Sequence, residues 1–522
     1  MSKPQTAAPD LEAAPPPDEF AARYKAGKPQ AVSTRLVADL ETPVSAYLKI
    51  AAGQAPAFLL ESVEGGATRG RYSIIGMKPD LIWRATGETA EINREALTGG
   101  TFVRDERPAL ISLRELLAES RIELDGGLPP MAAGVFGYMG YDTIRLIERL
   151  PNTPPDQLGV PDAILVRPTL MAIFDSVKDE MTLVTPVRPV KGVTAKVAYA
   201  QALERLGAVV AALDKPQHHD KQPVAASIEL HEPQSNTRPS EYHDMVARAR
   251  EYIKAGDIFQ VVLSQRFTAP FELPPFALYR ALRRINPSPF LYHLDFGDFA
   301  LVGSSPEILV RVRQGEVTIR PIAGTTRRGA SEEEDRMLSE ALLRDPKELA
   351  EHLMLLDLGR NDVGRVAEIG SVRVTAKNTI ERYSHVMHIV SNVVGRLSSN
   401  CDAVDALMAG FPAGTVSGAP KVRAMEIIDE LEKSKRGPYA GCVGYFGADG
   451  EMDTCIVLRT ALVKDGKLHV QSGAGVVYDS VPENEQQECI NKAKAVVRAA
   501  DEAVRFATGA KPQRSGNKGQ WG

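Results

Sequence analysis

The segment Ile308–Ile322, with the sequence Ile-Leu-Val-Arg-Val-Arg-Gln-Gly-Glu-Val-Thr-Ile-Arg-Pro-Ile, holds two strand-like runs separated only by Gln314 and Gly315. So short a connection joins antiparallel strands, because parallel strands need a crossover of a dozen or more residues. Strand-like runs at 290–294 and 299–302 follow one another in the same way. The sequence therefore predicts hairpins, in an α/β (α+β) fold built on antiparallel sheets.

The chain of 522 residues is long for one small core, and it predicts two domains or one large architecture. A polar stretch rich in proline, from Asp214 to Ser240, marks the boundary. We expect a disordered arm over 1–19, an N-terminal domain over 20–213, a linker over 214–239, a second domain over 240–508 and a disordered tail over 509–522.

Composition narrows the class of partner. A formal net charge of −5 gives no basic footprint, so we expect a small molecule or a protein as partner, with no nucleic acid and no membrane. The stretch 1–19 lacks the pattern of a secretion signal, and no apolar run approaches membrane-spanning length. Four cysteines without Cys-x-x-Cys spacing fit reduced thiols in a cytoplasmic protein.

Two glutamate pairs, Glu348 with Glu351 and Glu485 with Glu488, each follow a helix-start signal. Residues three apart share one face of a helix. Mg²⁺ binds one or two carboxylates and keeps water ligands, so two helices that meet could hold it without Cys or His. The alternative is that each pair lies on a solvated helix face.

Helix capping accounts for part of this pattern. Asp345 and Ser480 are expected N-caps, which makes Glu348 and Glu483 the expected capping-box partners. Helix capping gives no local role to Glu351, Glu485 and Glu488, and these three residues therefore favour the metal site.

Further candidate site residues lie in the last quarter of the chain. The segment Thr415–Lys421 places hydroxyls and a glycine at a helix start, where an anion could bind, although a simple serine cap explains Ser417 equally. The run Gly473–Gly475 allows close approach of a ligand to the backbone or a bulge. Arg459 ends an apolar strand and needs an anion, either an internal carboxylate or a substrate carboxylate. Tyr439 is a core residue or a ligand contact.

Seven ordered motifs carry a family resemblance. They are Leu59–Ser62, Gly256–Gln265, Asn286–Phe290, Ser305–Glu307, Arg320–Thr325, Glu351–Asp362 and Gly414–Lys421. Together they resemble anthranilate synthase component I, the large subunit that opens tryptophan biosynthesis, from about the end of the arm to Phe506. The resemblance implies two large antiparallel sheets packed together with helices outside, and a catalytic half that binds chorismate with Mg²⁺.

The resemblance also implies roles for the acidic residues. Glu351 and Glu488 would ligate Mg²⁺, while Glu348 and Glu485 would hold its water ligands. Whether Glu485 contacts the metal directly stays open. The metal would bind the ring carboxylate of chorismate.

Substrate and catalytic residues follow from the same motifs. The residues implied to bind chorismate are Gly324, Thr325, Tyr439, Arg459, Gly473, Ala474 and Gly475, of which Arg459 and Tyr439 would hold the enolpyruvyl carboxylate. Glu307 would protonate the departing C4 hydroxyl, and His388 would serve the later loss of pyruvate. Thr415 is also implied to be catalytic. His385 could be confused with His388 on sequence alone.

The nucleophile separates family members that share this scaffold. Relatives that add water resemble one another in having Lys where this chain has Gln260, and an amide cannot deprotonate water. Aminodeoxychorismate synthases have Lys where this chain has Ala323. We therefore expect ammonia to add at C2 and the product to be anthranilate, instead of isochorismate, salicylate or 4-amino-4-deoxychorismate.

The source of ammonia should be another chain. No Gly-x-Cys-x-Gly glutaminase elbow occurs, and the nearest approach, Gly441–Gly444, has the wrong spacing. We expect a separate glutamine amidotransferase subunit, anthranilate synthase component II, to deliver ammonia, or free ammonia to be used in its absence.

The N-terminal half resembles a regulatory domain that binds tryptophan as feedback inhibitor. The residues implied for the tryptophan pocket are Glu61 and Ser62 from this half, and Asn286, Pro287, Ser288, Pro289 and Phe290 from the other. The alternative for Leu59–Ser62 is a strand end with a polar stop. A second hypothesis for the whole chain is a non-catalytic subunit that senses tryptophan, against which the retained acids, His388 and Arg459 argue.

Overall fold

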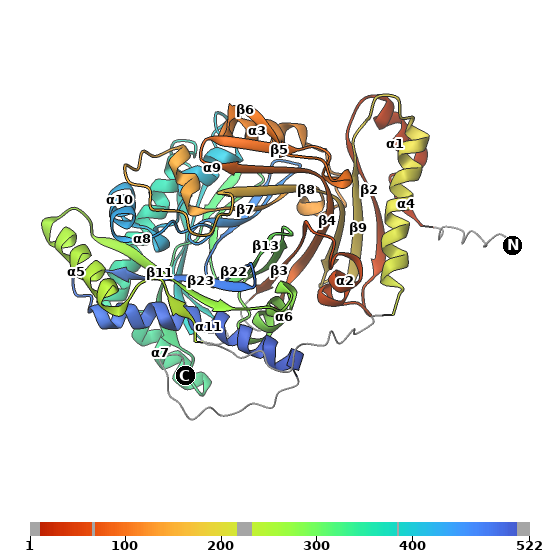
Figure 1. Ribbon diagram of the computed structural model, residues 1–522. Helices are drawn as coiled ribbons and strands as arrows, with labels where there is room; N and C mark the ends of the chain where they lie inside the picture. Colours follow the sequence, from red (N-terminus) through yellow and green to blue (C-terminus); the bar gives the residue numbers. More distant parts are fainter. Residues whose placement is uncertain (1–10, 65–67, 217–231, 384–385, 509–522) are drawn as a thin grey trace.

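The computed structural model describes residues 11–64, 68–216, 232–383 and 386–508 (Figure 1). Within these ranges the strands form one hydrogen-bonded network of 23 strands, and every strand pair given there is antiparallel. The expected α/β (α+β) class with antiparallel sheets is confirmed.

Two long strands, β4 (Thr68–Thr86) and β8 (Ala163–Asp175), divide this network into two sheets. The first half of β4 pairs with β3 and its second half with β5. The start of β8 pairs with β7 and its end with β9. Because both strands pass from one sheet to the other, the two sheets are continuous through them.

The first sheet carries the strands on one side of this junction. Its order is β1 (Ala13–Ala14), β2 (Gln30–Val37), β9 (Glu180–Val187), β8, β4, β3 (Ala57–Glu64), β12 (Phe290–Asp295), β13 (Phe299–Ser305), β22 (Thr460–Lys464), β23 (Lys467–Val476) and β11 (Gln260–Pro270), with β10 (Gln234–Ser235) and β19 (Gly418–Ala419) on the far edge of β11.

The second sheet carries the others. Its order is β6 (Val103–Pro108), β5 (Thr89–Asn93), β4, β8, β7 (Gly134–Met139), β20 (Cys442–Gly447), β21 (Met452–Ile456), β14 (Ile308–Arg313), β15 (Glu316–Ile319), β18 (Val386–Arg396) and β17 (Arg373–Arg382), with β16 (Ile322–Arg327) beside β15 on the same edge of β18.

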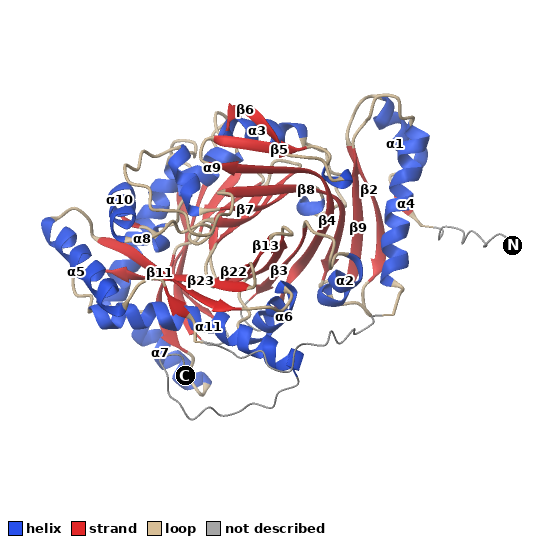
Figure 2. Cartoon of the chain, in the orientation of Figure 1, coloured by secondary structure: helices blue, strands red, loops and turns tan. Residues whose placement is uncertain are grey.

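The strands lie inside and the helices outside, as Figure 2 shows. One apolar cluster, which includes Phe58, Phe136 and Tyr445, joins the facing surfaces of the two sheets. Two larger clusters lie between the sheets and the helices. The helices are α1 (Pro17–Lys25), α2 (Pro43–Ile50), α3 (Ala109–Glu119), α4 (Ala195–Leu213), α5 (Pro239–Ala255), α6 (Pro275–Ile285), α7 (Glu332–Leu342), α8 (Pro346–Gly364), α9 (Ala403–Gly410), α10 (Lys421–Leu431) and α11 (Pro482–Thr508). The implied layering is confirmed.

The hairpin that opened the sequence analysis forms as expected. Arg313 of β14 pairs with Glu316 of β15, and the two residues between them have φ angles of +50° and +73°. Two positive φ values are the geometry of a tight hairpin turn that follows strand twist. The second run breaks at Pro321, after which β16 begins.

The expected disordered arm over 1–19 is wrong where the chain is described. Ala13 pairs with Thr34 of β2, and α1 begins at Pro17. Phe20 is fully buried, and Leu11 packs against the same apolar cluster. A composition rich in Ala and Pro concealed these apolar anchors. Residues 1–10 and the expected tail over 509–522 lie outside the described residues.

The division into 20–213 and 240–508 does not correspond to two separate sheets. Strand β3 of the first half pairs with β12 of the second, and β7 pairs with β20. Each sheet therefore contains strands from both halves. The expected linker over 214–239 contains β10 and the first residue of α5, and its central part, 217–231, lies outside the described residues. Among the described helices, none is both long and apolar enough to cross a membrane.

Candidate active site

The two glutamate pairs lie on α8 and α11; α11 packs against β23, and α8 is joined to β11 through Gln260. Asp345 caps α8 by accepting hydrogen bonds from the backbone N–H groups of Lys347 and Glu348, at 2.9 and 3.2 Å. Gln260 of β11 donates from Nε2 to Glu351 Oε1 at 3.3 Å. The same Nε2 lies 2.6 Å from the position that a Cβ on Gly475 would occupy. Gln260 thus connects α8 to the glycine-rich part of β23.

Charge interactions show that the pairs lie close together. Burial raises the pKa of Glu348, and the charges of Glu351 and Glu488 raise it further. Burial also raises the pKa of Glu485, against a hydrogen bond from Ser480 that lowers it. Since like charges disfavour ionisation of their neighbours, Glu348 lies near enough to Glu351 and Glu488 for their charges to interact.

The capping-box expectations are wrong for both glutamates. A Cβ on Gly324 would lie 3.2 Å from Glu348 Oε2, so this carboxylate faces β16 and not the start of its own helix. Ser480 accepts from the backbone N–H of Val477 at 2.9 Å, and Glu483 is largely exposed. Helix α8 starts where expected, whereas α11 begins at Pro482, so the expectation that Ser480 is its N-cap is wrong; Glu348 points into the site.

A lysine that the sequence analysis missed enters the same cluster. Lys492 Nζ lies 2.7 Å from Glu488 Oε1 and donates to the carbonyl oxygen of Gly473 at 3.0 Å. Its position four residues after Glu488, on the same helix face, was a usable signal. Among the described residues, no group of three or more His, Cys, Asp or Glu side chains is already arranged to hold a metal.

Glu307 is a buried carboxylic acid. It is 7 % exposed, and burial raises its pKa to about 8, although a hydrogen bond from Thr415 acts in the opposite direction. Thr415 Oγ1, on the 3₁₀ turn Gly414–Val416, lies 3.2 and 3.3 Å from the two carboxylate oxygens. Glu307 is therefore mostly protonated at pH 7, and Thr415 orients it.

His388 on β18 is a neutral imidazole. Its pKa is lowered to about 4, mainly by burial; a hydrogen bond to Gly324 acts to raise it, and the charge of Arg459 acts to lower it. Its Nδ1 lies 3.2 Å from the carbonyl oxygen of Gly324 and 3.1 Å from Thr325 Oγ1. A carbonyl oxygen only accepts, so we assign the proton to Nδ1, which leaves Nε2 as a proton acceptor. His385 lies outside the described residues.

Arg459 is the free cation of the site. Its guanidinium makes no hydrogen bond or ion pair with any side chain or backbone group of the described ranges. Burial lowers its pKa, and its backbone has a φ angle of +48°. A half-buried guanidinium without a partner needs an anion. Of the two alternatives left open by the sequence, an internal carboxylate is wrong within the described part of the chain.

The glycine-rich end of strand β23 packs closely against its neighbours. Gly473 and Gly475 point to the site, and Ala474 between them points into the core, where it is fully buried. A Cβ on Gly473 would lie 2.9 Å from the hydroxyl of Tyr439, which is itself buried beneath the strand. A side chain at either position would therefore collide, at Gly473 with the Tyr439 hydroxyl and at Gly475 with the Gln260 amide.

A separate cavity of about 790 Å³ lies between the two halves. It is lined by Glu61, Ser62, Pro289 and Phe290, four of the residues that the resemblance implied for the tryptophan pocket. Arg283 of α6 binds Glu61 through two hydrogen bonds of 2.6 and 2.9 Å, so this carboxylate already has a partner.

The rest of the implied pocket is different. Asn286, Pro287 and Ser288 do not line this cavity; Asn286 ends α6, and its carbonyl oxygen accepts from Ser304 at 2.5 Å. Residues missed by the sequence analysis take their place, among them Tyr445 and Cys455. Tyr445 lies on β20 and Cys455 on the neighbouring strand β21, and their place in the cavity wall can be recognised only once the facing sheet is known.

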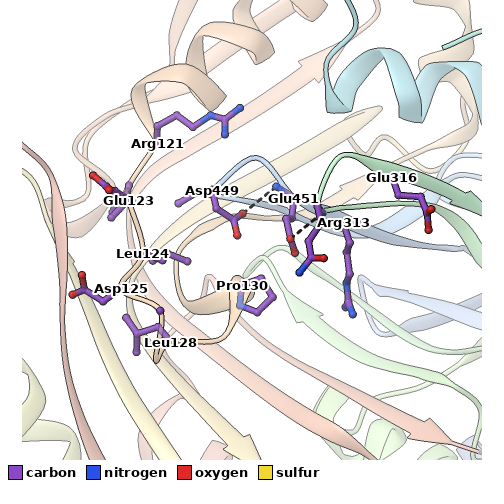
Figure 3. A pocket seen from close by; sticks show the side chains of 14 residues that line it. Arg121, Glu123, Leu124, Asp125, Leu128, Pro130, Arg313, Glu316, Asp449 and Glu451 are labelled. Atoms are coloured by element: carbon purple, nitrogen blue, oxygen red, sulfur yellow. Dashed lines mark hydrogen bonds between the residues drawn. The ribbon is translucent and has the colours of Figure 1, made fainter. Parts of the chain in front are cut away.

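A larger cavity of about 1000 Å³ contains none of the expected site residues (Figure 3). Its wall carries acidic side chains such as Glu123, Asp449 and Glu451, together with Arg121 and Arg313. Size alone therefore does not identify the site here, since the buried acid, the histidine and the free arginine all lie elsewhere.

Comparisons with known proteins identify the family of the chain. Residues 56–498 match the family model of chorismate binding enzymes. Anthranilate synthase component 1 of Cereibacter sphaeroides is 59% identical over 503 residues, which cover 96% of this chain and 99% of the relative. The protein of that name from Thermus thermophilus is 47% identical over 90% of this chain and 97% of its own length.

A solved structure supports the same grouping. Anthranilate synthase component I from Streptococcus pneumoniae TIGR4 is 38% identical and superposes with a TM-score of 0.71, covering 89% of this chain and 99% of its own. An isochorismate synthase from Escherichia coli shares the fold at a TM-score of 0.68 but only 20% identity.

Proposed function

The chain belongs to the family of chorismate-binding enzymes, and from this premise we propose that it is component I of an anthranilate synthase, which converts chorismate and ammonia to anthranilate, pyruvate and water. The observation that carries the proposal is the grouping of a buried acid with a raised pKa, a neutral histidine and an arginine without a partner among the described residues. The charge of Arg459 lowers the pKa of His388, and Glu307 and Arg459 both interact with Tyr383. Glu307 would supply the acid for the leaving hydroxyl, His388 the base, and Arg459 the anchor for a carboxylate of the substrate.

The donor set of α8 and α11 fits Mg²⁺. All four side chains offer hard oxygen ligands, and Mg²⁺ needs only one or two of them because it keeps water. We propose Glu351 and Glu488 as ligands, with Glu348 and Glu485 holding the metal's waters. The raised pKa of Glu348 supports this, since a cation would relieve the repulsion among these carboxylates. Bound Mg²⁺ would supply positive charge for the ring carboxylate of chorismate.

Two anchors fix a dianion in one orientation. We propose that the backbone of Gly473, Ala474 and Gly475 contacts the ring carboxylate, while Arg459 and Tyr439 hold the enolpyruvyl carboxylate. Lys492, on the same helix face as Glu488, adds a cation near the first anchor. Separate positive groups at the two ends reduce the orientations available to the substrate before reaction.

The acid and base have complementary states. Glu307 is protonated and gives its proton to the departing C4 hydroxyl, which leaves as water while ammonia bonds to C2. The C2 proton of the resulting amino intermediate then passes to His388 Nε2, and the C3–O bond to the enolpyruvyl group breaks, releasing pyruvate. Gly324 and Thr325 keep the Nδ1 proton in place.

His388→Met is expected to lower anthranilate formation by roughly 10²-fold, since a general base contributes about 10²- to 10⁴-fold. A non-aromatic amino intermediate should accumulate, which chromatography of the reaction mixture measures. The matched control is His469→Met, because His469 Nδ1 also bonds a threonine, Thr268, at 3.0 Å. Normal anthranilate formation by the His388 variant would remove the proposed role.

We propose ammonia as the nucleophile because Gln260, an amide that cannot deprotonate water, stands where relatives that add water have Lys. Gln260 bonds Glu351 through Nε2, and its buried Oε1 has no partner among the described residues, so it can accept from an N–H of ammonia. Ala323 is buried and offers no nucleophile that could direct the amine to C4. Lys492 is occupied by Glu488 and Gly473. We propose that a separate glutamine amidotransferase subunit supplies the ammonia.

The cavity between the halves is the proposed site for tryptophan as feedback inhibitor. Its wall joins Ser62 of the first half to Pro289 and Phe290 of the second. Of the residues carried over by resemblance, Asn286, Pro287 and Ser288 do not line this cavity, so we propose no direct contact between them and tryptophan. We accordingly propose 20–213 as the regulatory half and 240–508 as the catalytic half.

Ser62→Arg is expected to raise the tryptophan concentration for half-inhibition about tenfold or more, because the larger side chain fills the cavity; effector couplings are typically 5- to 150-fold. Activity without tryptophan should persist. Inhibition curves measure this, with Thr98→Arg, on the exposed 3₁₀ turn Ala96–Thr98, as control. An unchanged curve for Ser62→Arg would show that tryptophan binds elsewhere.

The product assay tests the proposal as a whole. The purified chain, given chorismate, Mg²⁺ and an ammonium salt at alkaline pH, should release fluorescent anthranilate. Isochorismate or 4-amino-4-deoxychorismate as the product would contradict the assignment.

A further inference from the structure

A row of three side chains crosses three adjacent strands at His388. In the antiparallel ladders, Thr325 of β16 lies opposite His388 on one side, and Glu381 of β17 lies opposite it on the other. Directly opposed residues project to the same face of a sheet. The acid Glu381 therefore lies beside the imidazole, although neither the sequence analysis nor the proposed chemistry uses it.

Tyr383 connects Glu381 to the imidazole. Its hydroxyl donates to Glu381 Oε2 at 2.8 Å. Its ring meets that of His388 edge to face, with centroids 5.5 Å apart and an interplanar angle of 62°. Tyr383 is 8 % exposed, and Arg328 Nη1 donates to its carbonyl oxygen at 2.7 Å. The tyrosine is thus held at its backbone, at its hydroxyl and at its ring.

Glu381 is in turn held from the cavity between the halves. Arg320 Nη2 binds its other carboxylate oxygen, Oε1. Arg320, Glu381 and Tyr383 all line the cavity of about 790 Å³. Tyr383 therefore contacts both this cavity and His388, and Arg320 and Glu381 hold it from the cavity side.

We propose that Tyr383 is a positioning residue for His388, held by Glu381 and Arg320 so that the imidazole presents Nε2 to the substrate and responds to a carboxylate in the cavity. The inference rests on the proposed function. Gly324 and Thr325 hold only Nδ1, about which the ring can still swing, and the Tyr383 ring closes off that movement. A ligand carboxylate in the cavity would compete with Glu381 for Arg320 and so loosen the hydroxyl of Tyr383.

Two substitutions distinguish the role of the Tyr383 ring from that of its hydroxyl. Tyr383→Leu removes both, and misorientation of His388 should raise the ratio of released amino intermediate to anthranilate about tenfold or more. Tyr383→Phe keeps the ring contact, so this ratio should stay within about twofold. Its tryptophan midpoint should nevertheless shift about fivefold or more, the lower end of usual effector couplings.

A matched control is available on α5. Tyr252 also donates to a carboxylate at 2.8 Å, that of Glu430, away from both cavities, so Tyr252→Phe should change neither quantity. Thermal melts check that each variant folds. If Tyr383→Leu does not fold, Tyr383→Phe alone tests the proposal.

The outcomes are distinguishable. If the wild-type chain makes anthranilate and Tyr383→Leu lowers intermediate and product equally, the residue is merely structural and the positioning role is wrong. An unshifted tryptophan midpoint in Tyr383→Phe overturns the link to the cavity. A wild-type chain that makes no anthranilate overturns the proposed function first, and this inference with it.

Discussion

Glu307→Gln is expected to lower kcat for anthranilate formation by about 10²- to 10⁴-fold, the usual contribution of a general acid. Glutamine keeps the size and the hydrogen bond from Thr415 but cannot donate a proton to the leaving hydroxyl. The measurement is the initial rate with saturating chorismate, ammonia and Mg²⁺. Glu316→Gln, on the exposed end of β15, is the control that should keep wild-type rates. A Glu307 variant within threefold of wild type would remove the proton donor from the account.

The same residue predicts the pH profile. Burial raises the Glu307 pKa to about 8, so the proton is present below that pH and is lost as pH rises through it. The His388 pKa is lowered to about 4, so its imidazole is neutral above that value. We expect kcat/KM for chorismate, expressed per free ammonia, to be highest between these limits, with an alkaline fall near pH 8. The alkaline fall should be absent from the residual activity of Glu307→Gln.

Glu488→Gln is expected to raise the Mg²⁺ concentration for half-maximal rate at least about tenfold, since even partners that only orient metal ligands contribute about 10- to 100-fold in metal affinity or activity. The substitution removes a charged ligand and also frees Lys492 from its 2.7 Å ion pair. Mg²⁺ titrations of the initial rate measure the effect.

A nearby control isolates the metal. Glu483→Gln lies one turn earlier on α11, with its side chain 68% exposed, and it changes the charge of the helix by the same amount. It should leave the Mg²⁺ midpoint unchanged. Equal midpoints for Glu488→Gln and the wild type would rule out Glu488 as a ligand.

The local signals of the sequence were dependable where one element decides the outcome. The two-residue connection at Gln314 and Gly315 specifies a hairpin by itself, and Asp345 caps α8 as its position before Pro346 indicates. Glu348 was misread because the capping box is also a local pattern, whereas its carboxylate turns to Gly324 on a distant strand. Competition between a local and a tertiary partner cannot be judged from spacing alone.

The arrangement of the halves was not readable for a similar reason. Nothing in the sequences of β4 and β8 states that each strand serves two sheets, because that depends on which strands meet them. The residues that line a cavity also depend on which strands meet. The expected wall therefore included Asn286, which follows the end of α6 and does not line the cavity, and omitted Tyr445 and Cys455. The motifs identified the segments that form the candidate site, whereas the directions of their side chains depend on the fold.

The most direct test of the account is the binding of Mn²⁺, in place of Mg²⁺, followed by water proton relaxation with and without chorismate. We predict that the wild-type chain binds one Mn²⁺ and that chorismate tightens this binding, because coupling between two ligands is reciprocal. The double variant Glu351→Gln, Glu488→Gln should lose both the binding and its response to chorismate. Mn²⁺ binding that is equal in the double variant, or indifferent to chorismate in the wild type, would contradict a metal held by Glu351 of α8 and Glu488 of α11.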